Sequence, residues 1–406
     1  MAIDNKDKKV LKSSIEREQN EVACSAECEK IKGSKNLNVP HLRFPEFSGE
    51  WKMVSLQDIA TINPKSDPLQ NTFIYIDLEA VEKGELRKIQ EIMREEAPSR
   101  AQRVIDNNDI LFQCVRPYQK NNYIHRILNT SNQQWVASTG YAQIRTTELP
   151  NYIYHLLNTD EFNRKVMVRC TGSSYPAINS EDLATIHLYY TPDKKEQLKI
   201  SRLLDLLDKR IATQNKIIEK LQSLIKGIAQ HCIKESTSGN TYVKLGDICQ
   251  ITTGKLDANA QVDNGIYPFF TCAEQPFKID SFAFDTEALL ISGNGANLGY
   301  INYYKGKFNA YQRTYVLDLF SENIQYIKWA LKVLLPKRIA IEKSSSNTPY
   351  IVLSTLTDLR LPIPCKSKQS FIANLMQSLE RKLSNQIAQY DSYNYLKQYL
   401  LRQMFI

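Results

Sequence analysis

Two segments of the chain match: Leu203-Leu204-Asp205-Leu206-Leu207-Asp208-Lys209-Arg210-Ile211-Ala212-Thr213-Gln214 and, 172 residues later, Leu375-Met376-Gln377-Ser378-Leu379-Glu380-Arg381-Lys382-Leu383-Ser384-Asn385-Gln386. In both, apolar residues recur at steps of three and four, the spacing of a helix that buries one stripe. The first stripe runs through Leu204, Leu207, Ile211, Gln214, Ile218, Leu221, Ile225, Ile228 and Cys232. The second runs through Met376, Leu379, Leu383, Gln386, Tyr390, Tyr393, Lys397, Leu400 and Met404. We expect two long helices that pack on each other, with Gln214 opposite or nearly opposite Gln386.

Prolines precede both helical segments, at Pro192 and at Pro362 and Pro364. Because proline is tolerated where a helix begins but not inside it, both helices are expected to start just after these residues. The first seam, from Leu204 to Cys232, is about 42 Å long at 1.5 Å per residue.

Shorter matches upstream of both helices indicate that the whole unit is duplicated. Residues 54–62 (VSLQDIATI) match residues 243–251 (VKLGDICQI) at an offset of 189. DNNDIL at 106–111 matches DTEALL at 285–290 at an offset of 179, and SSYP at 173–176 matches SNTP at 346–349 at 173. The offsets shrink in one direction, as expected for one ancestral unit whose second copy has shorter loops.

The remaining segments have the pattern of mixed α/β domains. Short β-rich runs lie at 72–76, 110–114, 141–145 and 313–319, and helical patterns at 151–168 and 323–343. The predicted class is α+β: two similar mixed α/β domains separated by two long helices. The expected division is a charged N-terminal extension over 1–38, flexible or a frayed helix, the first domain over 39–191, the first helix over 192–236, the second domain over 237–364 and the second helix over 365–406.

Composition narrows the class of protein. A 42% hydrophobic and 24% charged composition is ordinary for a globular protein, and no run of eighteen apolar residues predicts a membrane span. The first nine residues lack the apolar stretch of a secretory signal. The eight cysteines are scattered, which favours reduced thiols in the cytoplasm, and the close pair Cys24 and Cys28 has no second pair to complete a zinc site.

The net charge of +8 lies entirely in the helical segments. Residues 193–235 carry ten basic and six acidic side chains, and residues 366–406 carry six and two, so each contributes +4. The globular parts are therefore neutral. Charge alone supports nucleic-acid binding only weakly, because a solvated helix face explains it equally well.

Several fragments resemble catalytic or cofactor-binding motifs but lack residues that those motifs require. The glycine-rich run at 293–299 lacks the Gly-Lys-Ser/Thr ending that cradles phosphates, and its third glycine is misplaced for a dinucleotide fold. The run Asn347-Thr348-Pro349-Tyr350 departs at its second position from the Asn-Pro-Pro-Tyr loop of adenine methyltransferases. The five histidines have no paired spacing. We expect no active site and no cofactor in this chain.

Several motifs resemble those of the specificity subunits of type I restriction-modification enzymes. The opening VPHLRFPEF at 39–47 with Trp51 and Leu56 is similar to the start of that family. The runs DILF at 109–112, VRPYQKN at 115–121, ASTGY at 137–141 and TGSSYP at 171–176 resemble its first recognition domain. The runs ISGNGAN at 291–297 and YQRT at 311–314 resemble its second. The resemblance covers about residues 39–406.

This resemblance implies a non-catalytic, cytoplasmic subunit that recognises double-stranded DNA. Two target-recognition domains would lie at opposite ends of an antiparallel, pseudo-two-fold coiled coil, each reading half of a bipartite target. Two modification (methyltransferase) subunits would bind the helices and carry S-adenosylmethionine. Restriction/translocase subunits would supply ATP- and Mg²⁺-dependent translocation and cleavage. A spacer of about 42 Å exceeds one DNA turn of about 34 Å, so intervening base pairs would go unread.

Base reading needs donors and acceptors on loops, and phosphates suit hydroxyls and cations. The candidates in the first domain are Arg116, Tyr118, Gln119, Lys120, Asn121, Asn122, Thr139, Tyr141, Ser173, Ser174 and Tyr175. The candidates in the second domain are Asn294, Asn297, Gln312, Arg313, Lys343, Ser344, Ser345, Ser346 and Asn347. The outward basic residues Lys209, Arg210, Lys216 and Lys220 fit either a partner subunit or phosphates.

Three alternatives stay open at this point: a free-standing, repressor-like DNA-binding protein with duplicated domains, a scaffold without a nucleic-acid role, and a stand-alone methyltransferase. Tight DNA binding without partners would favour the first. Absence of DNA binding would favour the second, and cofactor binding by the isolated chain the third.

Overall fold

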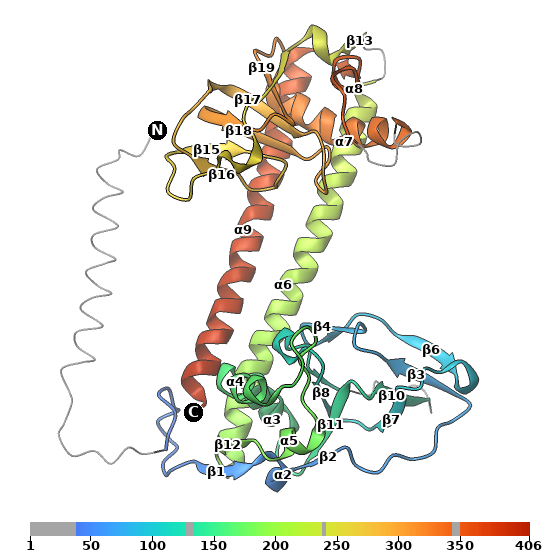
Figure 1. The fold of residues 1–406 in the computed structure, drawn as a ribbon, viewed down its shortest axis with the longest axis vertical. Coiled ribbons are helices and arrows are strands. Elements are labelled where there is room, and N and C mark those ends of the chain that lie inside the picture. The colour runs from blue at the N-terminus through green and yellow to red at the C-terminus, as the bar shows by residue number, and fades with distance from the viewer. Residues whose placement is uncertain (1–37, 127–132, 238–240, 343–349) are drawn as a thin grey trace, which may run out of the picture. The chain divides into compact units, whose positions relative to one another are not determined.

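The computed structural model describes residues 38–126, 133–237, 241–342 and 350–406. They form two compact units, residues 38–209 with Asn394–Ile406, and Arg210–Tyr393. The long helices α6 (Lys194–Glu235) and α9 (Lys366–Met404) contribute to both units and are light green and red in Figure 1. Cys24, Cys28 and nearly all of the predicted N-terminal extension lie outside the described residues.

The first unit begins with a short strand–helix–strand element: β1 (Lys52–Ser55), α2 (Leu56–Ile59) and β2 (Ala60–Ile62). The turn of helix starts at Ser55 because the Asp58 carboxylate accepts a hydrogen bond from the Ser55 backbone N–H at 2.7 Å. Strand β1 pairs antiparallel with β12 (His187–Tyr190), the last strand before α6.

Two four-stranded sheets make up most of this unit. One has the order β2-β11-β8-β9, with β8 (Ile110–Gln113), β9 (Tyr123–Ile124) and β11 (Tyr141–Thr146). The other has the order β6-β3-β10-β7, with β3 (Thr72–Ile76), β6 (Gln90–Met93), β7 (Ala101–Ile105) and β10 (Gln134–Ser138). Strands β4 (Val81–Glu82) and β5 (Glu85–Leu86) form a small antiparallel hairpin. The strands predicted at 72–76, 110–114 and 141–145 are confirmed.

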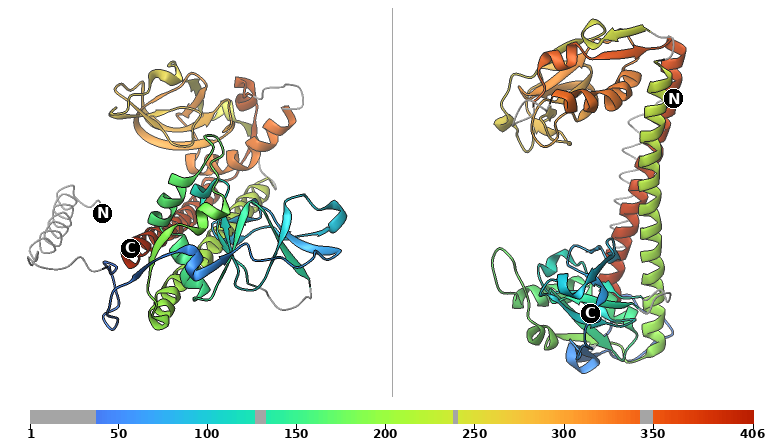
Figure 2. Two further views of the ribbon diagram at one scale, coloured as in Figure 1. Left: turned by 60° about the horizontal axis from the view of Figure 1, so that its bottom comes forward. Right: turned by 90° about the vertical axis from the view of Figure 1, so that its right-hand side faces the viewer.

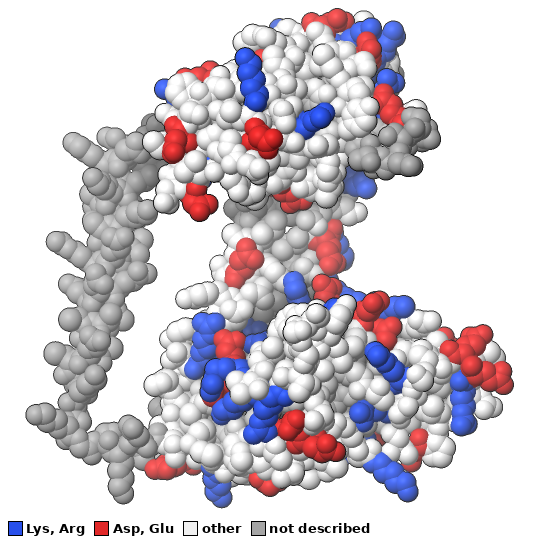
Figure 3. All heavy atoms as spheres, viewed as in Figure 1, with Lys and Arg blue, Asp and Glu red and all other residues white. Residues whose placement is uncertain are grey.

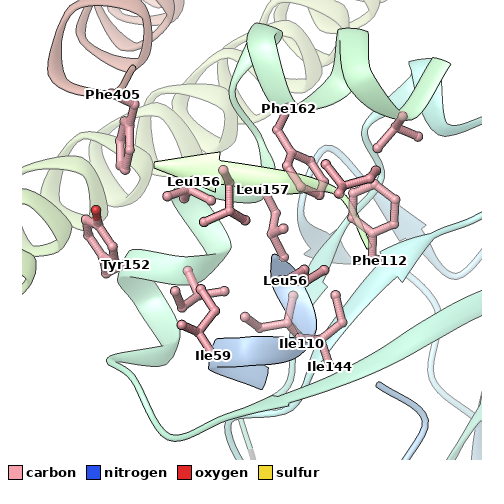
Figure 4. Close-up of a cluster of buried hydrophobic side chains, with 14 of the residues drawn as sticks. Leu56, Ile59, Ile110, Phe112, Ile144, Tyr152, Leu156, Leu157, Phe162 and Phe405 are labelled. Carbon is pink, nitrogen blue, oxygen red and sulfur yellow. The ribbon is translucent and has the colours of Figure 1, made fainter. Parts of the chain in front are cut away.

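The helical pattern predicted over 151–168 is confirmed, and the structure divides it into two helices, α3 (Pro150–Leu157) and α4 (Asp160–Arg169). Thr159 separates them and caps the second, since its hydroxyl accepts a hydrogen bond from the Phe162 N–H at 3.2 Å. The short α5 (Ser180–Ala184) precedes β12. Figure 4 shows side chains from these elements, such as Leu56, Leu156 and Phe162, meeting in one core that also takes in Phe405.

The second unit contains one six-stranded sheet of order β14-β19-β17-β18-β15-β16. Its strands are β14 (Gln250–Thr253), β15 (Tyr267–Phe270), β16 (Phe277–Ile279), β17 (Phe284–Ser292), β18 (Ile301–Ala310) and β19 (Thr314–Asp318). A separate pair joins β13 (Thr241–Lys244) to β20 (Arg360–Ile363), and α8 (Leu353–Thr357) precedes β20. The predicted helix over 323–343 is α7 (Ile324–Glu342), drawn in orange in Figure 2. Its buried side chains belong to the same hydrophobic core as side chains of the sheet and of both long helices.

The strand registers confirm the duplication residue by residue. The equivalent ladders are Ile62–Ile144–Ile110 in the first unit and Ile251–Leu317–Leu289 in the second. Their members lie 189, 173 and 179 residues apart, which are offsets found by sequence matching. The region that is one continuous strand in the second unit, β17, is divided in the first unit into β7 and β8 by a turn at 106–109, with Asn108 at φ 74°. Strands β7 and β8 belong to different sheets, so the first unit has two sheets where the second has one.

The long helices pack as the heptad pattern predicts. Gln214 is only 2% exposed, and its Nε2 donates hydrogen bonds to Gln386 Oε1 at 2.9 Å and to the Gln386 carbonyl at 3.0 Å. Within the second unit the helices run antiparallel, since Lys368 Nζ also reaches the Glu235 carbonyl at 3.0 Å. The predicted α+β class is confirmed, with two sheet domains each followed by a long helix. The five-part division of the chain stays a prediction.

Candidate nucleic-acid interface

The polar loop predicted in the first domain follows β8 directly. It includes the single 3₁₀ turn Pro117–Gln119, flanked by Arg116 and Lys120 with φ of 55° and 51°. These left-handed conformations are disfavoured for side chains with a Cβ, at roughly 1–2 kcal/mol each. Tyr118 is exposed at the tip of this loop.

Gln113, at the end of β8, holds this loop in place. Its side chain is almost completely buried, and Nε2 donates to the Val115 carbonyl at 2.8 Å and to Gln119 Oε1 at 2.9 Å. Gln113 Oε1 accepts a hydrogen bond from the Asn121 N–H at 3.2 Å, and its backbone N–H donates to Asn122 Oδ1 at 2.8 Å. Gln113 is not among the residues predicted from the sequence, because a glutamine at the end of an apolar strand carries no local signal for this role.

Several predicted base readers are engaged in shaping the loop. Lys120 Nζ binds Asp160 Oδ1 at 2.7 Å, and Asn121 Oδ1 accepts the Lys83 N–H at 3.0 Å. Asn122 is buried and donates to Asn158 Oδ1 at 3.1 Å. These contacts support the loop; whether any of these side chains also touches DNA stays a prediction.

The structure brings Arg116 together with the second predicted loop. The Arg116 N–H donates to the Pro176 carbonyl at 2.8 Å, and its guanidinium lies over the ring of Tyr175, 4.3 Å from the centroid. Tyr175 is 63% exposed, and Ser173 and Ser174 beside it are exposed as well. Residues about sixty positions apart therefore form one surface.

Thr139 lies in the turn between β10 and β11, next to this surface. Its N–H donates to the Arg100 carbonyl at 2.8 Å, and the adjacent Gly140 carbonyl accepts the Cys114 N–H at 3.0 Å. Thr139 itself is half-buried, whereas Tyr141 is fully buried in the core.

In the second domain, Asn294 and Asn297 lie on the glycine-rich loop after β17 and meet at Cys272. Asn294 Oδ1 accepts a hydrogen bond from Cys272 Sγ at 3.0 Å, and Asn297 Nδ2 donates to the Cys272 carbonyl at 3.0 Å. Cys272 was not predicted, because an isolated cysteine gives no sequence signal. Gln312 and Arg313 are exposed beside this loop, and the Arg313 carbonyl accepts the Gly293 N–H at 2.9 Å.

The two loops have the same construction. The bond from Cys114 N–H to the Gly140 carbonyl corresponds to that from Gly293 N–H to the Arg313 carbonyl, at offsets of 179 and 173. Likewise Ile178 N–H donates to the Cys114 carbonyl and Ile351 N–H to the Gly293 carbonyl. Of the third candidate segment in the second domain, Lys343, Ser344, Ser345, Ser346 and Asn347 lie outside the described residues.

The surface charge of the first unit is only weak support for DNA binding. Figure 3 shows Lys and Arg gathered around α4 on the visible face of the first unit, mixed with Asp and Glu. Arg164 and Lys165 both pair with Glu161, at 2.9 and 3.3 Å, and Arg402 pairs with Asp160 at 2.7 Å. Such exposed pairs neutralise one another locally. On the helices, Lys209, Arg210, Lys216 and Lys220 are all exposed.

Within the described ranges, no group of three His, Cys, Asp or Glu side chains is arranged to hold a metal ion. None of the helices in that part of the chain combines the length and the apolar character needed to cross a bilayer.

Comparison with known proteins identifies the family. The model of the type I restriction modification DNA specificity domain matches residues 48–223 and again residues 237–390. The specificity subunit of the EcoDI type I restriction enzyme of Escherichia coli is 44% identical over 137 residues, which are 34% of this chain and 30% of that protein. A putative type I specificity subunit of Mycoplasma genitalium is 22% identical over 276 residues, 63% of this chain and 70% of that protein.

Solved structures agree with the fold. The crystal structure of a type I restriction-modification S subunit from M. genitalium superposes with a TM-score of 0.62 at 17% identity, covering 91% of this chain and 99% of that one. A chain from work on complex assembly and conformational transition of the type I R-M system has a TM-score of 0.55 at 22% identity, covering 86% and 96%.

A duplicated sheet domain, each copy followed by a long helix and each matched by the same model, defines the class: the chain belongs to the family of type I restriction-modification DNA specificity proteins. It is a DNA specificity subunit of a type I restriction-modification system, the non-catalytic part of that enzyme.

Proposed function

We propose that each domain reads one half of a bipartite double-stranded DNA target. The observation that carries this proposal is that the two loops share their backbone construction but not their side chains. Arg116 and Lys120 stand where the second domain has Gly295 and Gly299, 179 residues later. Two readers of one design with different polar groups suit a target whose halves differ in sequence.

The DNA-contacting set that we propose combines the candidates from both domains. In the first it is Arg116, Tyr118, Gln119, Lys120, Asn121, Thr139, Ser173, Ser174 and Tyr175. In the second it is Asn294, Asn297, Gln312, Arg313, Lys343, Ser344 and Asn347. The support is that the described members cluster around one loop construction in each domain, with exposed members such as Tyr118, Tyr175 and Gln312 at its surface.

The proposal extends to partners. Two modification (methyltransferase) subunits would dock on the long helices, and restriction/translocase subunits would complete a complex that acts in the cytoplasm. Its support is that both helices carry exposed apolar side chains that lie outside the seam between them, among them Leu206, Leu224 and Tyr395. We expect S-adenosylmethionine, ATP and Mg²⁺ to bind those partner subunits, not this chain.

The test is to map modified adenines in DNA from cells that carry this chain with its modification subunits. We expect one two-part motif with a fixed gap. A single uninterrupted motif, or no modification that depends on this chain, would contradict the proposal.

A gel-shift assay with a salt series separates the repressor-like alternative. The complex with modification subunits should bind a duplex carrying the motif far more tightly than the isolated chain does. Equal, tight binding by the isolated chain would favour a free-standing DNA-binding protein.

A further inference from the structure

The loop after β8 carries two side chains at a backbone cost that the second domain avoids. Arg116 and Lys120 are left-handed at the positions where the second domain has Gly295 and Gly299, with φ of 79° and 82°. Glycine adopts this conformation without steric penalty, whereas a residue with a Cβ adopts it at a cost in free energy. Strain held at a surface loop points to a use for the side chains.

The two cations differ in whether they form an ion pair within the domain. Lys120 is committed to Asp160, at 2.7 Å. Arg116 forms no ion pair with any described residue and lies instead on the exposed ring of Tyr175. Stacking covers one face of the guanidinium but leaves the in-plane N–H groups available.

A stacked guanidinium is suited to edge-on recognition. Guanine offers two acceptors, O6 and N7, in one plane of the major groove, and two parallel N–H groups of arginine match them. Because the Tyr175 ring already restricts the plane of Arg116, little side-chain freedom remains to be lost on binding. Phosphate also accepts paired N–H groups from arginine, but a phosphate contact carries no base preference.

Gln113 keeps Arg116 in this position. Its buried side-chain amide joins the start of the loop, at the Val115 carbonyl, to its end, at the Asn121 N–H. The corresponding residue of the second domain, Ser292, closes its glycine loop with backbone bonds, from its N–H to the Tyr300 carbonyl and from the Gly299 N–H to its own carbonyl. In the loop without glycines, side chains take the place of these backbone acceptors: Asn122 Oδ1 accepts the Gln113 N–H, and Gln113 Oε1 accepts the Asn121 N–H.

We propose that Arg116 selects a guanine in the half-site read by the first domain, and that Gln113 is the positioning residue that holds it for this purpose. The inference rests on the proposed function, since it requires that this domain reads one half of a bipartite target. It adds the base and the residue that discriminates it.

The test uses the complex with modification subunits and measures methylation rates on duplexes carrying every single base change in the wild-type motif. For Arg116→Ala and Arg116→Gly, we expect preference for guanine at one position of the first half-site to fall about ten- to a hundredfold. Preferences in the second half-site should be unchanged. Arg116→Lys should not restore the preference, because lysine lacks the planar fork.

Gln113→Ala should weaken the preference at the same position more than at other positions of the same half-site, which a general loss of stability would not do. Lys88→Ala, an exposed cation on the same domain, should change nothing. Arg116→Gly copies the backbone of the second domain, so it should fold even if Arg116→Ala does not.

Equal slowing on all duplexes by the Arg116 variants, with wild-type base preferences kept, would mean that Arg116 does not discriminate bases, and would overturn the inference while leaving the proposed function intact. If the wild-type complex shows no bipartite motif, the proposed function itself fails.

Discussion

At the scale of single residues, His125 is a buried titratable group of the first domain. It is fully buried against Trp135, with ring centroids 4.9 Å apart, and neither of its ring nitrogens has a hydrogen-bond partner among the described residues. Burial lowers the pKa of His125 from 6.5 to about 4, so the ring is neutral at neutral pH. The folded protein therefore binds fewer protons at this position than the unfolded chain does.

It follows that stability should fall as the pH drops from about 6.5 towards about 4, by at most about 1.4 kcal/mol per pH unit from this group. His125→Phe should flatten this part of the curve in denaturant titrations repeated across the pH range. The control is His187→Phe, because it makes the same chemical change at an exposed position. Equal slopes in wild type and His125→Phe would rule out the assignment.

At the scale of elements, each domain is anchored to a long helix by an equivalent polar contact. In the first unit His155 on α3 lies 2.9 Å from Asp205 and 4.0 Å from Asp208 on α6. In the second, Lys328 on α7 binds Glu380 on α9 at 2.8 Å. Lys328 follows His155 by 173 residues and Glu380 follows Asp208 by 172, so both contacts join equivalent elements of the two units, although the hydrogen bond of His155 goes to Asp205.

The second anchor can be tested by a thermodynamic cycle. Lys328 is only 7% exposed, and Glu380→Gln would leave its charge buried without its principal partner. We expect a loss of roughly 1–3 kcal/mol in unfolding free energy, less than for a fully buried pair because Glu380 is about a third exposed. The double variant Lys328→Met/Glu380→Gln should recover most of this loss in urea titrations.

Lys332→Ala provides the matched control, since Lys332 also contacts Glu380, at 3.1 Å, but is more exposed. It should cost less than about 1 kcal/mol. A Glu380→Gln variant as mild as Lys332→Ala would mean that the anchor contributes little.

At the scale of the whole molecule, the two units have separate cores. Leu56, Ile110 and Phe162 belong to one and Leu289, Tyr326 and Leu361 to the other. Separate cores allow one domain to change without repacking the other.

We therefore predict that replacing residues 51–190 by the corresponding domain of another family member will change one half of the methylated motif and leave the other half as it was. Mapping modified adenines in cells with the hybrid complex measures this directly. A change in both halves, or in neither, would show that the domains do not read independently.

The sequence by itself determined the duplication, the two long helices and their register. These features rest on local periodicity and on ordered matches, which a chain carries without reference to its folded neighbours. The pairing of Gln214 with Gln386 could be predicted because both occupy the same position of a heptad seam. The strand at 72–76 could be predicted from its local residue pattern. The break between helices at Thr159 could not, because helical spacing continues across it.

Only the tertiary structure decided how the candidate residues are arranged. Arg116 meets Tyr175 across 59 positions and Asn294 meets Cys272 across 22, because strand pairing and loop paths join segments that no local pattern relates. The same holds for Gln113, whose role depends on burial at the end of β8 under the loop. Periodicity specifies which face of an element is buried, but contacts between distant loops depend on how the complete sheet is assembled.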